Sequence, residues 1–138
     1  MKILIDTGVV LDAIAARVPF AASAQEILLL ATSKQLQGAI TSFTVSDIYH
    51  LSLNRLQDST QAMEILRRLF VVLSIVAVDS AICHKALDLG LHDYDDAILV
   101  ASAIKYKANY LVTRTIPHFI SLPVPVISPE DFLRMRLS

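Results

Sequence analysis

Apolar residues alternate along this chain between short continuous runs and longer segments with helical spacing. The run at residues 2–5, which ends at Asp6, is typical of a strand buried on both faces. Similar runs, rich in β-branched residues, predict strands at 39–41, 71–78, 110–112 and 124–127. Helical spacing predicts helices at 9–16, 21–37, 42 or 44 to about 56, 59 or 60 to about 69, 80–89, 94–107 and 130–137.

Residues that favour helix ends support these boundaries. Gly38 and Gly90 are expected to end the helices before them. The expected N-caps are Ser42 or Thr44, Ser59 or Thr60, and Asp93. Prolines in and beside residues 124–127 indicate that this strand lies at the edge of its sheet.

The order of strands and helices predicts the fold class. Strands that alternate with helices pair in parallel through right-handed crossovers, and helices then cover both faces of the sheet. We therefore expect one α/β domain over residues 1–138, with three α/β/α layers and a central parallel sheet. The chain contains no internal repeat and no linker long enough to divide it.

The composition of the chain limits the classes of function that the protein can have. The longest apolar runs, at 70–78 and 97–104, are shorter than the roughly 20 residues of a membrane helix. We expect no membrane span, and because the N-terminus lacks the features of a secretory signal, we expect a cytoplasmic protein.

With 12 basic and 13 acidic residues, the net charge of −1 provides no broad positive field, so any nucleic-acid contact must be local. The single cysteine, Cys83, excludes an internal disulfide and is expected to pack as an apolar residue.

Three aspartates are placed where a ligand site is expected. In open parallel sheets the ligand crevice lies beyond the carboxyl ends of the strands, where Asp6 stands. Asp47 and Asp96 lie in the first turns of two helices that can begin around the same crevice. Converging carboxylates repel one another unless a cation neutralises them, and Mg²⁺ or Mn²⁺ prefers such oxygen ligands. A water activated by the metal can attack a phosphodiester. The chain has no phosphate-binding glycine loop with its lysine and no zinc-binding pattern of histidines or paired cysteines.

Several segments resemble the PIN-domain family, in order and over essentially the whole chain. They are residues 3–12 with Asp6, residues 17–20, residues 44–49 with Asp47, residues 93–97 with Asp96, residues 110–119 and residues 128–132. The resemblance implies a metal-dependent ribonuclease with Asp6, Asp47 and Asp96 as catalytic metal ligands. It also implies the toxin of a toxin–antitoxin pair, an antitoxin protein as partner, and a homodimer.

Three positions depart from the family's pattern. Asp47 stands where the family usually has glutamate, Thr115 replaces the common asparagine or aspartate, and His118 falls where the loop usually offers aspartate. The fourth acid is therefore missing. His118 is either a ligand for a softer metal such as Mn²⁺ or only a loop residue. These departures leave open an alternative, a weakened PIN module that binds nucleic acid or a protein partner without cleavage. A phosphate-accepting receiver domain is disfavoured, because it needs a lysine where Thr113 and Arg114 stand.

Other residues near the acids have two interpretations each. Thr7 and Thr113 either orient a ligating carboxylate by a hydrogen bond or satisfy nearby backbone. Arg114 either holds the scissile phosphate or forms a salt bridge. Asp93 is either a further metal ligand or only the helix cap, and Asp12 is expected at the surface.

The substrate is also constrained. Because basic residues are few, we expect a short single-stranded RNA or a basic surface assembled by dimerisation. Tyr49 and Tyr94 lie near the acids in sequence, where they either stack on bases or pack within the protein.

Overall fold

The computed structural model describes residues 1–116 and 122–137, and His118 lies outside this part of the chain. The strands are β1 (Lys2–Ile5), β2 (Gln37–Thr41), β3 (Ser74–Val76), β4 (Tyr110–Val112) and β5 (Val126–Ile127). The helices are α1 (Thr7–Ile14), α2 (Ala21–Thr32), α3 (Ser42–Leu56), α4 (Ser59–Val72), α5 (Ser80–Asp88), α6 (Tyr94–Tyr106) and α7 (Pro129–Leu137). None of the helices in the described residues is both long enough and apolar enough to span a membrane.

The five strands form one parallel sheet in the order β3-β2-β1-β4-β5. The chain extends the sheet from β1 to β2 and β3 on one side, and then crosses back to add β4 and β5 on the other. The order therefore changes direction between β1 and β4, which is where ligands bind in open sheets of this kind. The expected edge position of the last strand is confirmed.

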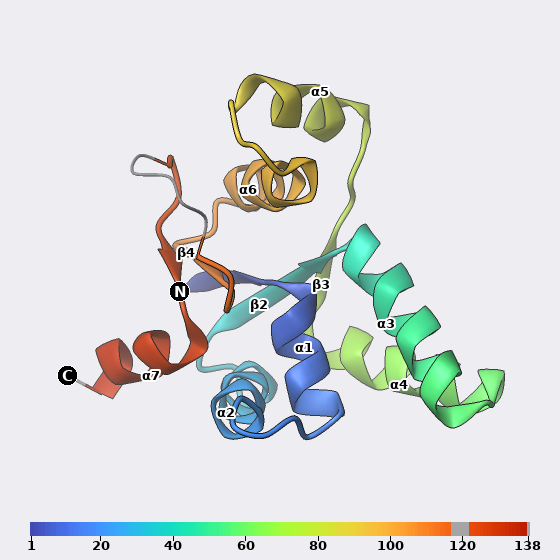
Figure 1. The fold of residues 1–138 in the computed structure, drawn as a ribbon. Helices are drawn as coiled ribbons and strands as arrows, with labels where there is room; N and C mark the ends of the chain where they lie inside the picture. The colour runs from blue at the N-terminus through green and yellow to red at the C-terminus, as the bar shows by residue number, and fades with distance from the viewer. Residues whose placement is uncertain (117–121, 138) are drawn as a thin grey trace.

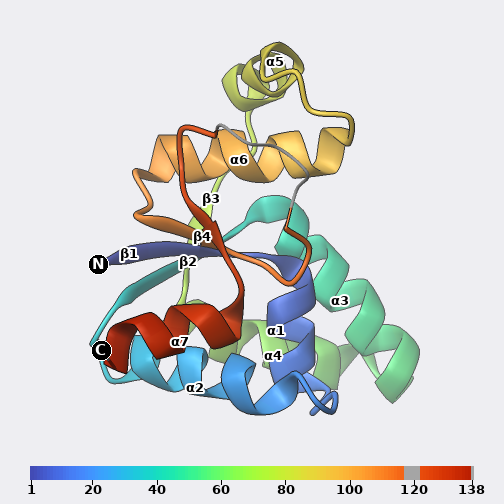
Figure 2. The same ribbon diagram turned by 60° about the vertical axis from the view of Figure 1, so that its left-hand side comes forward.

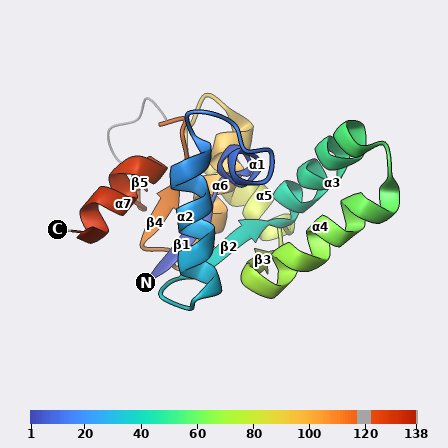
Figure 3. The ribbon, with the colours of Figure 1, turned by 90° about the horizontal axis from the view of Figure 1, so that it is seen from below.

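Helices cover both faces of the sheet in three layers (Figure 1). Alternate residues of β1 point to opposite faces, so Ile3 and Ile5 pack towards α1 and α2, whereas Leu4 packs towards α6. On the α6 side, α5 lies outside α6 and away from the sheet (Figures 1 and 2). On the other side, α7 packs along α2 (Figure 2), and α3 and α4 form an antiparallel hairpin beyond β2 and β3 (Figure 3). The predicted three-layer α/β/α fold is confirmed.

Several predicted boundaries are wrong. The first helix and the last strand were expected at 9–16 and 124–127 but span Thr7–Ile14 and Val126–Ile127, and the end of the second helix differs more. The second helix was expected to reach residue 37 and end at Gly38, but α2 ends at Thr32 and Lys34 leaves the helix with φ of 62°. Gly38 instead lies inside β2, where an added Cβ would lie 2.8 Å from Leu73 Cδ2. Its lack of a side chain serves strand packing rather than a helix end.

The strand expected at 71–78 begins later than predicted. The helix α4 continues to Val72, because Leu69 and Leu73 are both buried at helical spacing, and β3 is confined to Ser74–Val76. Local burial therefore overrides the β-branched composition of the run.

The predicted caps of two helices are wrong by at least one residue, because Thr41 rather than Ser42 or Thr44 caps α3 and Asp58 rather than Ser59 or Thr60 caps α4. Asp6, for which no cap was predicted, caps α1 through its side-chain oxygen. The predicted cap at Asp93 is confirmed, since its Oδ1 accepts the Asp96 N–H at 3.1 Å. Cys83 is partly buried and packs against the core between α5 and α6.

Candidate active site

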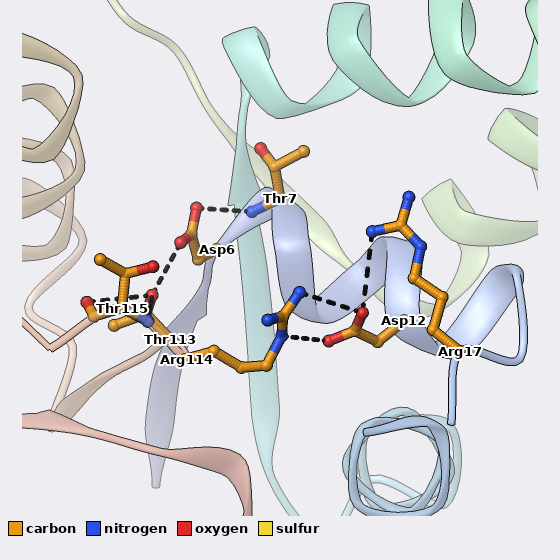
Figure 4. Close-up of polar contacts among 7 residues, drawn as sticks. All are labelled: Asp6, Thr7, Asp12, Arg17, Thr113, Arg114 and Thr115. Carbon is orange, nitrogen blue, oxygen red and sulfur yellow. Dashed lines mark hydrogen bonds and ion pairs between the residues drawn. The ribbon is translucent and has the colours of Figure 1, made fainter. Parts of the chain in front are cut away.

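Asp6 lies at the carboxyl end of β1, and both of its carboxylate oxygens have fixed donors. Oδ1 accepts the backbone N–H of Thr7 at 2.7 Å, and Oδ2 accepts the hydroxyl of Thr113 at 2.7 Å (Figure 4). The Thr113 hydroxyl also accepts the N–H of Thr115 at 3.1 Å, and the carboxylate of Asp6 is a shorter acceptor for its proton than the Thr115 carbonyl oxygen at 3.4 Å. The backbone N–H of Asp6 donates to Val112, which ties the residue to β4. Asp6 therefore stands in one orientation, half-buried, at the point where the strand order reverses.

An open cavity of about 410 Å³ surrounds the exposed side of Asp6. Asp47 of α3 and Asp95 and Asp96 of α6 also line it. The structure thus brings together the three aspartates singled out from the sequence, from β1, α3 and α6, and adds Asp95. Asp47 is exposed, whereas Asp96 is partly buried.

The electrostatics of the cavity favour a cation. Burial raises the pKa of Asp96 above its ordinary value, and the charges of Asp93, Asp6 and Asp95 raise it further. These charges disfavour the ionised state of Asp96, and a cation among the carboxylates would remove that penalty. The available donors are carboxylate and hydroxyl oxygens, which suit Mg²⁺ or Mn²⁺ rather than a softer metal.

The acids are not drawn together into a finished metal site. Among residues 1–116 and 122–137, no group of three aspartate, glutamate, histidine or cysteine side chains is placed to hold a metal ion. The donor chemistry and the charge fit a hard divalent cation, while the closing of the ligands around it stays a prediction.

The side chains of Thr113 and Thr7 have different partners. The Thr113 hydroxyl donates to the carboxylate of Asp6 and so orients it. The side chain of Thr7, in contrast, pairs with the Thr44 hydroxyl at 2.8 Å, and only its backbone N–H reaches the carboxylate. Thr44 is 1% exposed and its N–H donates to Thr41 Oγ1. A short chain of hydroxyls thus joins the starts of α1 and α3 beside Asp6.

Asp12 is not at the surface as predicted, because it is fully buried and paired with arginine. Arg114 donates to its two oxygens from Nε at 2.6 Å and from Nη2 at 3.2 Å, and Arg17 Nη1 lies 3.8 Å away (Figure 4). The guanidinium of Arg114 also lies over the ring of Phe20, 4.1 Å from its centroid. Of the two interpretations of Arg114, the salt bridge is the one that the structure contains.

The other candidates lie outside the cavity lining. Asp93 is occupied as the cap of α6. The Tyr94 hydroxyl donates to the Cys83 carbonyl, and Tyr49 packs edge-on against His50. Phe43, which the sequence analysis did not single out, lines the cavity together with Ser46 and Leu99. Its position four residues before Asp47 was the available signal, since that spacing puts both side chains on one helix face.

The fold and these residues define a PIN-type α/β protein. A family model described as PIN domain matches residues 2–116, and the chain belongs to that family. A search of curated proteins found no match.

Solved structures with the same fold include proteins described as a toxin–antitoxin complex and as a toxin. One is VapBC2 from Rickettsia felis bound to a DNA fragment from its promoter, with 19% identity, a TM-score of 0.68, and 93% of this chain and 98% of that chain covered. A toxin–antitoxin complex from Klebsiella pneumoniae has 21% identity, a TM-score of 0.67, and coverage of 91% and 96%. VapC20 from Mycobacterium tuberculosis, described as a toxin that cleaves the sarcin–ricin loop, has 20% identity, a TM-score of 0.60, and coverage of 79% and 86%. At these identities the likeness establishes the shared fold.

Proposed function

We propose that this protein is a metal-dependent endoribonuclease that hydrolyses RNA phosphodiesters at the cavity around Asp6. The observation that carries the proposal is the gathering of four carboxylates from three elements around one open cavity. Membership of the PIN family, and the RNA-cleaving activity named for the VapC20 relative, support the same reaction class. Asp6, Asp47 and Asp96 are the proposed ligands of Mg²⁺ or Mn²⁺.

The roles of the residues follow from their contacts. Bound Mg²⁺ or Mn²⁺ would supply the Lewis acidity that activates water for attack on phosphorus. Asp6 is held ready for the cation by Thr7 N–H and by Thr113, whose hydroxyl leaves the opposite lone pairs of the carboxylate free. Asp96 contributes a charge that its surroundings disfavour without a cation. Arg114 acts through Asp12 to hold α1, and therefore Asp6, in place.

The experiment that tests this function compares the wild type with Asp6→Asn. A single-stranded RNA is incubated with each protein in Mg²⁺, in Mn²⁺, and in a chelator. We expect cleavage by the wild type with either metal and none in the chelator, and a loss of at least a hundredfold in Asp6→Asn, as about 2.7 kcal/mol of lost transition-state stabilisation predicts. Equal rates for the two proteins in the presence of metal would reject the proposal.

A second candidate is a PIN module that binds nucleic acid or a protein without cleaving it. The exposed Asp47, which stands where the family usually has the longer glutamate, favours it. Calorimetry separates the two candidates. A working site binds Mn²⁺ in the wild type and loses that binding in Asp96→Asn, whereas a non-cleaving module without a metal site gives no heat in either.

The proposal extends to partners and location. Two structural relatives are toxin–antitoxin complexes, which supports an antitoxin protein as a partner here as well. We propose in addition a homodimer, a cytoplasmic location and a single domain over residues 1–138. Sedimentation velocity of the purified chain measures the first of these, and a neighbouring gene for a small DNA-binding protein would supply the antitoxin.

A further inference from the structure

We propose that Phe43 is the residue on which the protein stacks a base of its single-stranded RNA substrate. This inference rests on the proposed ribonuclease function and names a substrate contact within the same cavity. It follows from three observations: where the ring is, how its backbone is held, and which chemistry surrounds it.

Phe43 exposes a large apolar surface at the carboxylate cavity. Its side chain is 49% exposed, although it lies in the first turn of a helix whose neighbouring Thr44 and Ile48 are almost completely buried. It lines the cavity with Asp6, Asp47 and Asp96. Phe43 and Asp47 are four residues apart on α3, so their Cβ atoms are separated by roughly 5–6 Å on one helix face. A base on the ring and a phosphate at the acids therefore belong to the same or to adjacent nucleotides.

The backbone that carries Phe43 is anchored on both sides. Ser42 Oγ accepts the N–H of Val78 at 3.0 Å, which ties the first turn of α3 to the segment after β3. Thr44 is tied to Thr7 through its hydroxyl and to Thr41 through its N–H, at 2.8 and 3.1 Å. The exposed ring is thus carried by a rigid turn. A pre-organised apolar surface loses little entropy when a ligand docks on it.

The residues that line the cavity around Phe43 favour a nucleobase as the ligand that contacts its ring. Carboxylates that hold a cation do not use an aromatic side chain, and covering the exposed ring of Phe43 removes apolar surface from water, which is favourable. An RNA strand presents both phosphates and flat base faces, and the lining of the cavity contains both carboxylates and the apolar side chains of Phe43 and Leu99. The chain carries few basic residues, so stacking supplies affinity that a positive groove provides in other single-strand binders. Stacking tolerates any base, and we expect binding with little sequence preference at this position.

The test measures kcat and KM for cleavage of a short single-stranded RNA in Mn²⁺, and Kd by fluorescence anisotropy with the same RNA. Phe43→Ala is expected to raise Kd and to lower kcat/KM by roughly five- to a hundredfold, and Phe43→Trp to keep the wild-type values. Phe70→Ala is the matched control, because Phe70 on α4 is 43% exposed and does not line the carboxylate cavity. It should change neither value, and a melting curve of each variant confirms folding.

A series of RNAs, each with one abasic position, identifies the stacked base. In the wild type, removing that base should weaken binding by the same factor as Phe43→Ala, and in the Phe43→Ala protein its removal should have no further effect. Unchanged Kd and kcat/KM in Phe43→Ala, in a wild type that cleaves RNA, would overturn the inference and leave the ribonuclease function standing. The inference would also be overturned by a second set of results. In it, Phe43→Ala weakens binding, Phe43→Trp does not restore it, and each abasic position weakens binding by the same factor in the wild type and in Phe43→Ala. A wild type that neither binds nor cleaves RNA would overturn both.

Discussion

At the scale of single residues, the donors around Asp6 hold its carboxylate in one orientation, as the proposed role of a cation ligand requires. An ionised carboxylate has about four lone-pair positions, and here Thr7 N–H and the Thr113 hydroxyl use one on each oxygen. Asp6 also lines the cavity, where the remaining positions are available to a cation. The Thr113 hydroxyl has Asp6 as its shorter acceptor, at 2.7 Å against 3.4 Å for the Thr115 carbonyl oxygen. Such fixed partners of a ligand commonly determine metal affinity.

The first prediction concerns Thr113. Replacement by valine keeps the shape of the side chain and removes the hydroxyl, so we expect Mn²⁺ affinity to fall by roughly ten- to a hundredfold. Thr113→Ser retains the hydroxyl and should keep affinity close to that of the wild type. Titration calorimetry measures both. Equal Mn²⁺ affinity in the valine variant and the wild type would mean that this hydrogen bond only stabilises the fold.

The position of a residue in the fold could be predicted from the sequence where the local hydrophobic pattern determines it. It could not be predicted where it depends on a partner far along the chain. Asp6 at a strand end and Asp96 at a helix start follow from the apolar pattern, and the structure brings both to one cavity. Asp12 was wrongly expected at the surface, because its partner Arg114 is 102 residues further along the chain. The role of Thr113 was left open for the same reason, since its carboxylate partner lies 107 residues before it.

At the scale of elements, the buried ion pair between Asp12 and Arg114 joins α1 to the segment after β4. The side chain of Asp12 is 1% exposed, and that of Arg114 is 33% exposed. Arg114 therefore retains access to water, while Asp12 has none. The pair fixes the direction in which α1 leaves Asp6, and hence the position of the carboxylate itself.

We accordingly predict that Asp12→Ala destabilises the protein more than the loss of an ion pair at the surface does. Leaving Arg114 partly buried without its partner should lower the free energy of unfolding by about 3 kcal/mol. Asp131→Ala, which removes the exposed pair with Arg134 on α7, should cost no more than about 1 kcal/mol. Urea denaturation of the three proteins gives the comparison. Similar costs for the two substitutions would contradict a structural role for the buried pair.

The contact between α5 and α6 predicts a dependence of stability on pH. The hydrogen bond from Lys105 Nζ, at 2.9 Å, and the N–H of Ile82 hold the pKa of Asp79 below its ordinary value of 3.8. Because the pKa is lowered in the folded state, the stabilisation is present above pH 3.8 and is lost as pH falls through the lowered pKa. Asp79→Asn keeps a helix cap but removes the charge.

Melting temperatures of the wild type and of Asp79→Asn, measured from pH 7 down to pH 3, test this. The wild type should melt higher at pH 7, and the difference should shrink as pH falls below about 4. Lys105→Met, which removes the other charge, should show the same convergence. A difference that stays constant over the whole range would assign the effect to the cap rather than to the ion pair.

Element types could largely be predicted from hydrophobic spacing, but the role of Gly38 and the start of β3 could not. Both involve Leu73, whose burial continues the spacing of α4 and whose side chain occupies the space beside Gly38 in β2. The two residues are 35 positions apart and belong to different segments. No pattern within either segment contains that information.

At the scale of the whole molecule, the cavity lies where the sheet order reverses and where α3 and α6 begin on either side of β1. The acids that line it belong to parts of the chain that meet only in the folded protein. Burial and the charges of the neighbouring acids disfavour the ionised carboxylate of Asp96, as its raised pKa indicates, and this cost opposes folding. A cation bound there would connect these elements and be released on unfolding.

The final prediction is that Mn²⁺ stabilises the entire domain and that this effect requires Asp6. A ligand that binds only the folded state at a hundredfold excess over its Kd contributes about 2.7 kcal/mol. For a chain of this size, that corresponds to a rise in melting temperature on the order of 10 °C. Asp6→Asn should melt near the wild type in a chelator and show almost no rise in Mn²⁺. Asp79→Asn, which alters a carboxylate outside the cavity, should keep the full rise, and an equal rise in Asp6→Asn would place the metal elsewhere.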